Sequence, residues 1–274
     1  MTPTEKGETF RALHQSGCFI LPNPWDIGSA RVLAALGAPA LATTSAGFAF
    51  TRGLPDGGHL SRDEMLAHAE EIVAATPLPV SADLENGYAD APDAVAETVR
   101  LAAGTGLAGC SIEDTDLTNG GAYEFDLTVE RIRAAVDAAR GAPHPFTLTA
   151  RADGVMVGAY DTDEAVRRLQ AFEAAGADVL YAPFLPDMAA VARVCTSVSL
   201  PVNALCAGRF TRETKDAFAA AGVRRISLGS SLASITQRAI VEATKAMFEA
   251  GDFSALQSGM RGSEVAALLE SGAP

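Results

Sequence analysis

Short apolar runs alternate along the chain with longer segments of helical pattern. Eight of these runs have the length of buried strands, and they lie near residues 18–22, 39–44, 78–83, 108–113, 146–151, 178–182, 200–205 and 225–229. Alternation of such strands with helices implies a parallel sheet that helices cover. Eight units in one chain of 274 residues predict an α/β fold of the closed (β/α)₈ type, a TIM-like barrel.

Glycines mark the points where helices end and strands follow. Gly37, Gly104, Gly176 and Gly222 each follow a helix-like stretch and precede an apolar run. Glycine just past a helix can adopt the left-handed conformation that closes it, so each one indicates a helix-to-strand connection. No linker interrupts the even spread of apolar runs, and we expect residues 1–274 to form a single barrel domain.

The tail of the chain predicts a helical extension over about residues 231–274. A long helix is expected from roughly Ser231 to Ala250, and a last helical piece runs through Ala266 to Leu269. This tail holds more apolar surface than closing a barrel requires. Two arrangements stay open on the pattern alone, since the terminal helix could be swapped between the subunits of a homo-oligomer or could fold back on its own barrel.

Composition excludes several classes of partner. The chain has 21 Lys and Arg residues against 34 Asp and Glu residues, and its formal net charge of −13 would repel nucleic acid and anionic membrane surfaces. The four cysteines form no C-x-x-C pair and lie mostly within apolar runs, as reduced core thiols do. No apolar stretch reaches about 18 residues, and no leader-like segment begins the chain. We therefore expect a soluble cytoplasmic protein.

Four carboxylates are placed where they could converge on one divalent metal. Asp83 and Glu113 each end a predicted strand, Glu85 follows Asp83 directly, and Asp56 lies in a loop after another strand. The carboxyl ends of the strands form the active end of a (β/α)₈ barrel, and acids gathered there are costly unless a cation compensates them. The sequence predicts a Mg²⁺ site, with Mn²⁺ as a substitute, in which Asp83 coordinates directly and the other three act through water.

A positive charge and a run of small residues are expected at the same end of the barrel. Arg151 ends the fifth strand and could bind a substrate carboxylate or stabilise a developing enolate. The alternative for Arg151 is a structural ion pair with Glu113 or Asp153. Backbone N–H groups after the second strand could approach a substrate oxyanion, and the residues concerned are Thr44, Ser45 and Gly47.

Two other kinds of chemistry are disfavoured by the sequence. Residues 104–109 match the dinucleotide pattern G-x-G-x-x-G, but they lead from a helix into a strand, whereas phosphate binding needs a strand that opens into a helix. Lysine occurs only at positions 6, 215 and 245, away from the predicted strand ends, so a Schiff-base aldolase would lack its nucleophile.

Five segments, in order, resemble the isocitrate lyase/phosphoenolpyruvate mutase superfamily. The strongest match is S-A-D-L-E-N-G-Y, which is similar to the superfamily's D-x-D-x-G-[YF] metal segment with Glu in the second acidic place. The I-E-D and A-R-x-[DE] signatures of the superfamily have counterparts as well. The five segments are residues 44–47, 53–56, 81–88, 111–114 and 149–153.

The resemblance implies an Mg²⁺-dependent enzyme on a (β/α)₈ barrel, often a dimer or tetramer with the last helix swapped between subunits. Members of the superfamily bind a 2-oxo or 2-hydroxy acid and pass through an enolate-like intermediate. By this resemblance Arg151 and the backbone N–H groups of Ser45 and Gly47 would hold the oxyanion. The substrate would also contact Thr44, Asp83 and Asn203, and Glu113 would join Arg151 in catalysis.

The chain departs from the superfamily in the segment that distinguishes its carbon–carbon lyases. Those lyases carry a K-[KR]-C-G-H loop whose Cys serves as acid/base, but residues 115–123 of this chain contain no thiol. Isocitrate or methylisocitrate lyase activity is therefore not expected. Thr118 and Asn119 fall near the gating-loop positions of the phosphonate-acting members, and Asn119 is a candidate catalytic residue. Relatives have Glu or His where this chain has Pro183.

Three functions stay open on the sequence. The first is an Mg²⁺-dependent lyase that acts on a small 2-oxo or 2-hydroxy acid by C–C cleavage or decarboxylation. The second is a phosphonopyruvate-type hydrolase or mutase that acts on a P–C bond. The third is a protein that binds a 2-oxo acid such as 2-oxoglutarate without turning it over.

Overall fold

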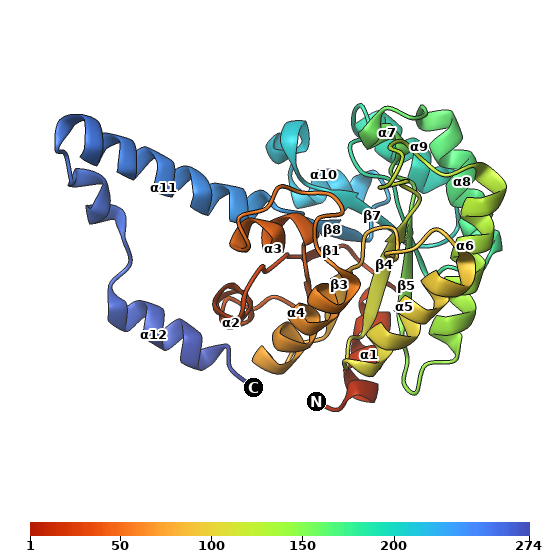
Figure 1. The fold of residues 1–274 in the computed structure, drawn as a ribbon, viewed down its shortest axis with the longest axis horizontal. Coiled ribbons are helices and arrows are strands. Elements are labelled where there is room, and N and C mark those ends of the chain that lie inside the picture. The colour runs from red at the N-terminus through yellow and green to blue at the C-terminus, as the bar shows by residue number, and fades with distance from the viewer.

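The computed structural model describes residues 1–274 and confirms the (β/α)₈ barrel (Figure 1). All neighbouring strands pair in parallel, in the order β1-β8-β7-β6-β5-β4-β3-β2. A single backbone hydrogen bond from Ala42 N to Pro22 O, 3.1 Å long, links the β1 and β2 edges. The strands are β1 (Phe19–Leu21), β2 (Leu41–Ala42), β3 (Val80–Asp83), β4 (Gly109–Glu113), β5 (Thr147–Arg151), β6 (Val179–Tyr181), β7 (Val202–Leu205) and β8 (Arg225–Ser227).

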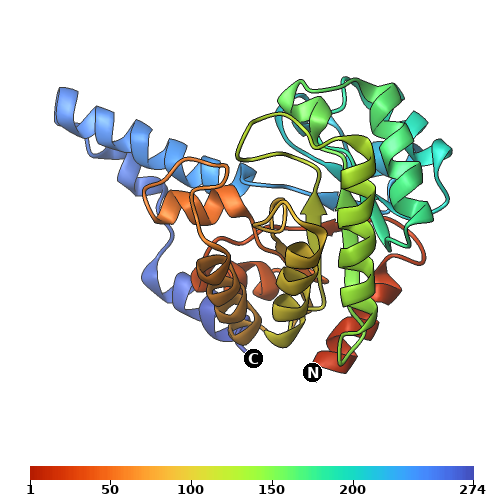
Figure 2. The same ribbon diagram turned by 45° about the vertical axis from the view of Figure 1, so that its right-hand side comes forward.

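Helices surround the strands on the outside of the barrel (Figures 1 and 2). Two short helices that the pattern does not predict, α3 and α7, begin directly after β2 and β5. The helices are α1 (Pro3–Leu13), α2 (Ile27–Ala35), α3 (Ser45–Thr51), α4 (Arg62–Ala75), α5 (Pro92–Gly104), α6 (Phe125–Arg140), α7 (Gly154–Val157), α8 (Thr162–Ala174), α9 (Met188–Ser197), α10 (Lys215–Ala220), α11 (Ser231–Ala250) and α12 (Gly262–Ser271), with 3₁₀ turns η1 (Gly208–Arg212) and η2 (Ser254–Ser258).

Alternate residues of each strand separate the apolar core from the polar interior of the barrel. On β5, Leu148 and Ala150 are fully buried in the cluster that also contains Ile132 of α6 and Leu169 of α8. Successive side chains of a strand point to opposite faces, so Thr149 and Arg151 face the inside of the barrel instead. The core therefore lies between sheet and helices, and it leaves the interior free for polar chemistry.

One row of paired residues crosses five strands on the inside of the barrel. Glu113 pairs with Arg151, Arg151 with Tyr181, Tyr181 with Asn203, and Asn203 with Arg225. Paired residues of neighbouring strands point to the same face of a sheet. These five side chains, which we call the inner row, are thus neighbours along the inner surface of the barrel.

The C-terminal helices form an arm that leaves the barrel and returns to it. The long helix α11 has the predicted bounds and projects away from the barrel, whereas α12 packs against α2 of the same chain (Figures 1 and 2). Several large apolar side chains of the arm are exposed, namely Ile235, Ile240, Val241, Phe248, Phe253, Leu256 and Met260. None of the helices has the length and apolar character that crossing a bilayer requires.

Candidate active site

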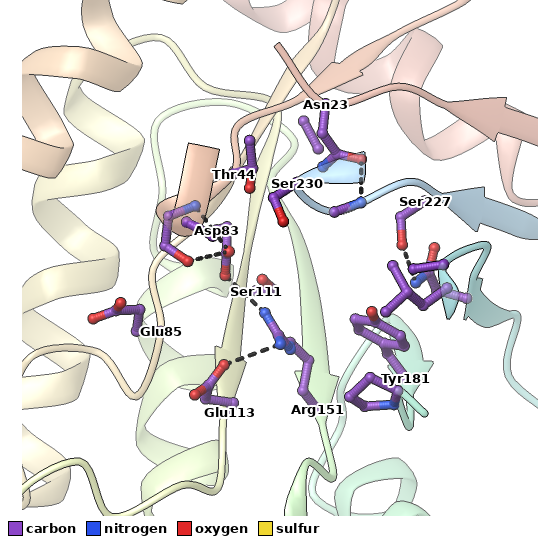
Figure 3. Close-up of a pocket in the computed structure, with 18 of the residues that line it drawn as sticks. Asn23, Thr44, Asp83, Glu85, Ser111, Glu113, Arg151, Tyr181, Ser227 and Ser230 are labelled. Carbon is purple, nitrogen blue, oxygen red and sulfur yellow. Dashed lines mark hydrogen bonds and ion pairs between the residues drawn. The ribbon is translucent and has the colours of Figure 1, made fainter. Parts of the chain in front are cut away.

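A cavity of about 330 Å³ opens at the carboxyl-terminal ends of the strands (Figure 3). This is the end of the barrel where the sequence analysis expects the chemistry. Of the residues that the sequence analysis assigns to the site, eight line the cavity: Thr44, Ser45, Asp56, Asp83, Glu85, Glu113, Arg151 and Asn203. The structure therefore brings together residues that lie up to 159 positions apart in the chain.

Asp83 lies at the centre of the acidic wall and contacts two other segments. Its Oδ2 accepts hydrogen bonds from the backbone N–H of Ser45, at 3.2 Å, and from the Ser45 hydroxyl, at 2.9 Å. Its Oδ1 accepts one from Nη1 of Arg151 at 2.7 Å. The side chain still keeps 20% of its surface exposed, so it can take a further partner from the cavity.

Arg151 is enclosed by carboxylates. Its Nη1 contacts Asp83, its Nη2 contacts Glu113 at 3.1 Å and Asp153 at 2.6 Å, and its Nε donates to Asp153 at 3.1 Å. Although burial alone would lower the pKa of Arg151, the three carboxylates raise it well above its ordinary value. The ion pair that the sequence left open as an alternative is thus present, and every nitrogen of the guanidinium has a partner.

The remaining carboxylates carry raised pKa values, mainly because they are buried and in addition because they lie near one another. Burial, with the Asp83 and Asp56 charges adding to it, raises the pKa of Glu85 to about 7. Burial and then the charge of Asp83 raise the pKa of Asp56. Burial raises the pKa of Glu113 well above its usual range, and Arg151 counteracts this only in part. A cation in the cavity would reverse these shifts.

The same wall fits a hard divalent cation with few direct ligands. Glu85 has φ +47° and accepts a hydrogen bond from Gly58 N at 3.2 Å through Oε1, but its buried Oε2 has no partner. No three His, Cys, Asp or Glu side chains lie close enough together to hold a metal ion between them. The donor set therefore suits a cation that one or two carboxylates bind directly and that the others reach through water.

The backbone donors expected after β2 are already in use. Thr44 caps α3, and its Oγ1 accepts the N–H of Gly47 at 3.2 Å, while the N–H of Ser45 points at Asp83. Gly47 does not line the cavity, and a Cβ there would lie 2.6 Å from Thr44 Cγ2 and 3.1 Å from Trp25 Cβ. In this arrangement Gly47 is required for close packing of α3, and Ser45 orients Asp83.

Asn119 lies outside the cavity, in the loop between β4 and α6. Its side-chain amide donates to Asp116 Oδ2 at 3.0 Å; Asn119 is exposed and Asp116 is half-buried. Leu117, two residues earlier, does line the cavity mouth together with Met156 and Phe184. A catalytic role for Asn119 would require this loop to move inward.

The far wall of the cavity contains residues that the sequence analysis did not single out. Asn203 is buried, accepts a hydrogen bond from Arg225 Nε at 2.8 Å and donates one to Ser227 Oγ at 2.9 Å. Arg225, Tyr181 and Ser227 also line the cavity. Their inward direction follows from strand pairing, which the sequence alone does not provide.

None of the four cysteines lines the cavity. Burial raises the pKa of all four thiols, and Cys110, a residue of β4, is fully buried in the core. Reactive cysteines have lowered pKa values instead. The chain thus has no thiol in the place where the resemblance puts the acid/base of the carbon–carbon lyases.

Comparison with known proteins identifies the family. A family model for phosphoenolpyruvate phosphomutase matches residues 10–248. The chain belongs to the isocitrate lyase/phosphoenolpyruvate mutase superfamily. This confirms the resemblance read from the five segments. As a member of this superfamily, the protein is an enzyme of the lyase type.

Curated relatives of this superfamily member carry different names. An uncharacterized protein of Mycobacterium tuberculosis is 33% identical over 226 residues, which are 81% of this chain and 82% of the relative. An oxaloacetate decarboxylase of Pseudomonas savastanoi pv. phaseolicola is 30% identical over 224 residues, which are 79% of this chain and 75% of the relative. A probable 2-methylisocitrate lyase of Corynebacterium glutamicum is 29% identical, with 74% and 67% covered.

Solved structures of similar proteins share the whole architecture. A Burkholderia cenocepacia protein described only as a lyase or mutase is 48% identical, with a TM-score of 0.93 over 97% of this chain and 95% of its own. An oxaloacetate acetylhydrolase in complex with oxalate is 26% identical, with a TM-score of 0.87 over 98% of this chain and 95% of its own. The relatives of this chain are thus named for several different reactions.

Proposed function

We propose that the protein is an Mg²⁺-dependent lyase that breaks a C–C bond of a small 2-oxo or 2-hydroxy carboxylic acid, by cleavage or decarboxylation, through an enolate-like intermediate. Mn²⁺ would substitute for Mg²⁺. The observation that supports this most is the gathering of four carboxylates and Arg151 around one cavity. The oxaloacetate decarboxylases and the oxaloacetate acetylhydrolase among the relatives support the same class of substrate.

Each residue of the acidic wall has a part in this proposal. Asp83 would bind the cation directly, and Asp56, Glu85 and Glu113 would hold its water ligands. When bound, Mg²⁺ acts as a Lewis acid that polarises the substrate carbonyl. Arg151 lies against Asp83 and supplies a fixed positive charge where the enolate oxygen develops negative charge. Asp153 and Glu113 hold the guanidinium in place from the opposite side.

Turnover of a panel of acids tests the proposal. The panel contains oxaloacetate and alkylmalates, each assayed with MgCl₂ and again after EDTA treatment. We expect magnesium-dependent loss of at least one of these acids, with a keto acid or CO₂ as a product. If no acid of the panel is consumed, the lyase proposal is wrong.

Two further arms separate the alternatives. Phosphate release from phosphonopyruvate would indicate chemistry at a P–C bond, an alternative favoured by a Burkholderia cenocepacia phosphonomutase that is 36% identical with a TM-score of 0.82. Calorimetry that detects magnesium-dependent binding of 2-oxoglutarate or pyruvate, without any turnover of the panel, would indicate a binding protein instead.

We also propose a homo-oligomer, a dimer or tetramer, that covers the arm. Phe248 is 85% exposed and Ile235 63% exposed on α11, and side chains of this size are rarely left in contact with water in such a group. Light scattering coupled to gel filtration gives the mass. Deletion of residues 231–274 should yield a particle with fewer subunits or an insoluble protein. If the full chain and the deletion variant are both monomers, the proposal is contradicted.

A further inference from the structure

Two arginines line the cavity, and they differ in how their charge is balanced. Arg151 and Arg225 are the only Lys or Arg side chains in the cavity wall, and both belong to the inner row. Arg151 contacts three carboxylates. Arg225 contacts none, because its hydrogen-bond partners are Asn203 and His14. The cation with spare binding capacity is therefore Arg225.

The partners of Arg225 are neutral. Asn203 accepts from Nε at 2.8 Å, and Nε2 of His14 lies 3.4 Å from Nη1. Nδ1 of His14 lies 2.8 Å from the carbonyl oxygen of Phe10, so the ring proton sits on Nδ1 and leaves a lone pair on Nε2 for Arg225. The Nη2 group donates no hydrogen bond to the protein. Asn203 and His14 thus hold the guanidinium in place without neutralising it.

A guanidinium in this position is costly to the folded protein. Arg225 is only 4% exposed, and burial, together with the nearby charge of Arg151, lowers its pKa to about 10. A buried charge is normally paired, and an unpaired one destabilises the fold. Residues that break this rule inside a cavity are typical of sites whose missing partner is a ligand.

The groups that line the rest of the cavity indicate which kind of ligand group Arg225 would bind. The 2-oxo acid end of the substrate belongs at the acidic wall with its cation, where Arg151 is already saturated. The rest of the wall near Arg225 offers Asn203, Ser227 and Tyr181, which are neutral hydrogen-bonding groups. An anionic group at the far end of the substrate would find Arg225 as its only free cation.

We infer that Arg225 is a specificity-determining residue that binds a second anionic group of the substrate, and that Asn203 and His14 are positioning residues for it. This rests on the proposed function, because it takes the 2-oxo acid end of the substrate to lie at Asp83. The chemical class that follows is a 2-oxo or 2-hydroxy acid with a carboxylate at its other end. A cavity of about 330 Å³ accommodates such an acid of four or five carbons.

Matched pairs of ligands test the inference on the unmodified protein. 2-Oxoglutarate is compared with 2-oxopentanoate, and oxaloacetate with 2-oxobutyrate, so that each pair differs only in the distal carboxylate. Binding in MgCl₂ is followed by the fluorescence of Trp25, which is the only tryptophan and packs against Gly47 beside the cavity. We expect the diacid of at least one pair to bind about tenfold or more tightly, because a charge-assisted hydrogen bond is formed only there.

Variants then assign the preference to Arg225. Arg225→Gln should abolish the preference for the diacid and leave the affinity for the monoacid within about twofold, while Arg225→Lys should restore part of it. Arg224→Gln is the matched control, because Arg224 is the next residue, is exposed and does not line this cavity. Arg224→Gln should keep the preference in full.

The outcomes separate this inference from the proposed function. If no 2-oxo acid binds in a magnesium-dependent way, the proposed function fails. If monoacids and diacids bind equally to the unmodified protein, the function stands and the inference is wrong, and this result needs no variant to fold. A purely structural role for Arg225 would weaken both members of each pair alike, which also overturns the inference.

Discussion

The two walls of the cavity are built from different chemistry on one barrel. The wall formed by β2 to β5 and their loops holds four carboxylates and a fully paired Arg151, whereas the wall formed by β6 to β8 holds hydroxyl and amide groups with the unpaired Arg225. The inner row joins the two walls without a break. This difference fits our proposal that the first wall, which we call the reacting wall, performs the reaction and that the second, the recognising wall, binds the rest of the substrate. The two tasks can then be disturbed separately.

The largest effect is expected at Asp83. Asp83→Asn replaces the side chain with one of nearly the same shape, which can keep its hydrogen bonds with Ser45. It removes the negative charge that we propose binds the cation, so kcat should fall by about 10³-fold. EDTA should abolish the activity of the unmodified protein, and MgCl₂ should restore it. Steady-state kinetics across a range of MgCl₂ concentrations measures both effects. If kcat is unchanged in the variant, Asp83 does not take part in the reaction, and the proposal that this wall performs it is contradicted.

Arg151 tests whether the reacting wall depends on its fixed charge. Arg151→Lys should lower kcat by about 10²-fold, because an ammonium cannot contact Asp83, Glu113 and Asp153 together. Arg151→Met should in addition destabilise the fold by about 3–5 kcal/mol, since it leaves buried carboxylates unpaired. Urea unfolding gives the stability, and turnover at saturating substrate gives kcat. Equal activity of the Lys variant and the unmodified protein would contradict this role.

Asn119 tests whether the loop between β4 and α6 takes part in the reaction, and its catalytic role is a proposal. If the loop carries Asn119 into the cavity during turnover, Asn119→Ala should lower kcat by about tenfold. Its contacts with Asp116 are exposed, so the stability should stay within about 0.5 kcal/mol. Thr118→Ala is a control in the same loop. Unchanged kcat in Asn119→Ala would place the loop outside the reaction.

The smallest effect is expected for the pH dependence of stability that His14, the neighbour of Arg225, contributes. Burial and the charge of Arg225 lower the pKa of His14 to about 3, so the folded protein keeps His14 neutral. The unfolded chain takes up a proton near its ordinary pKa, and stability is therefore complete above about pH 6.5 and falls as the pH drops toward 3. From about pH 7.5 to about pH 5.5 this one group should cost about 1 kcal/mol.

His68 provides the reference for that measurement. Burial lowers its pKa to about 4, and its ring stacks on Phe48 of α3, away from Arg225. Urea unfolding at several pH values should show a shallower dependence on pH in His14→Gln, with the contribution of His68 remaining. The same steepness in His14→Gln and the unmodified protein would mean that His14 is not buried as the structure has it.

The sequence predicted the reacting wall more fully than the recognising wall. Asp83, Glu113 and Arg151 end apolar runs, and a strand end in a (β/α)₈ barrel fixes the place of its last side chain. Arg225 begins a strand of three residues and follows another arginine, so nothing local separates it from a surface residue. Its burial results from pairing with Asn203, which is a tertiary fact.

The small residues after β2 illustrate a second limit. Their composition indicated that the backbone could be approached closely, which is correct for Gly47, but the approaching group is the side chain of Thr44 rather than a ligand. A pattern of small residues reports available space and does not report what fills it. The same holds for α3 and α7, which are too short for a helical period to appear.

The contact between α12 and α2 does not depend on which copy of the chain supplies the helix. Gly272 approaches the backbone of Arg31 so closely that a side chain would not fit, and residues 251–261 before α12 are exposed throughout. Folding back and reaching across to a neighbour would therefore form the same contact with the same energy. If the chain forms the homo-oligomer that we propose, the connecting residues and the protein concentration would decide between the two arrangements, and shortening those residues would favour exchange with a neighbour without changing the surface of α2 that α12 contacts.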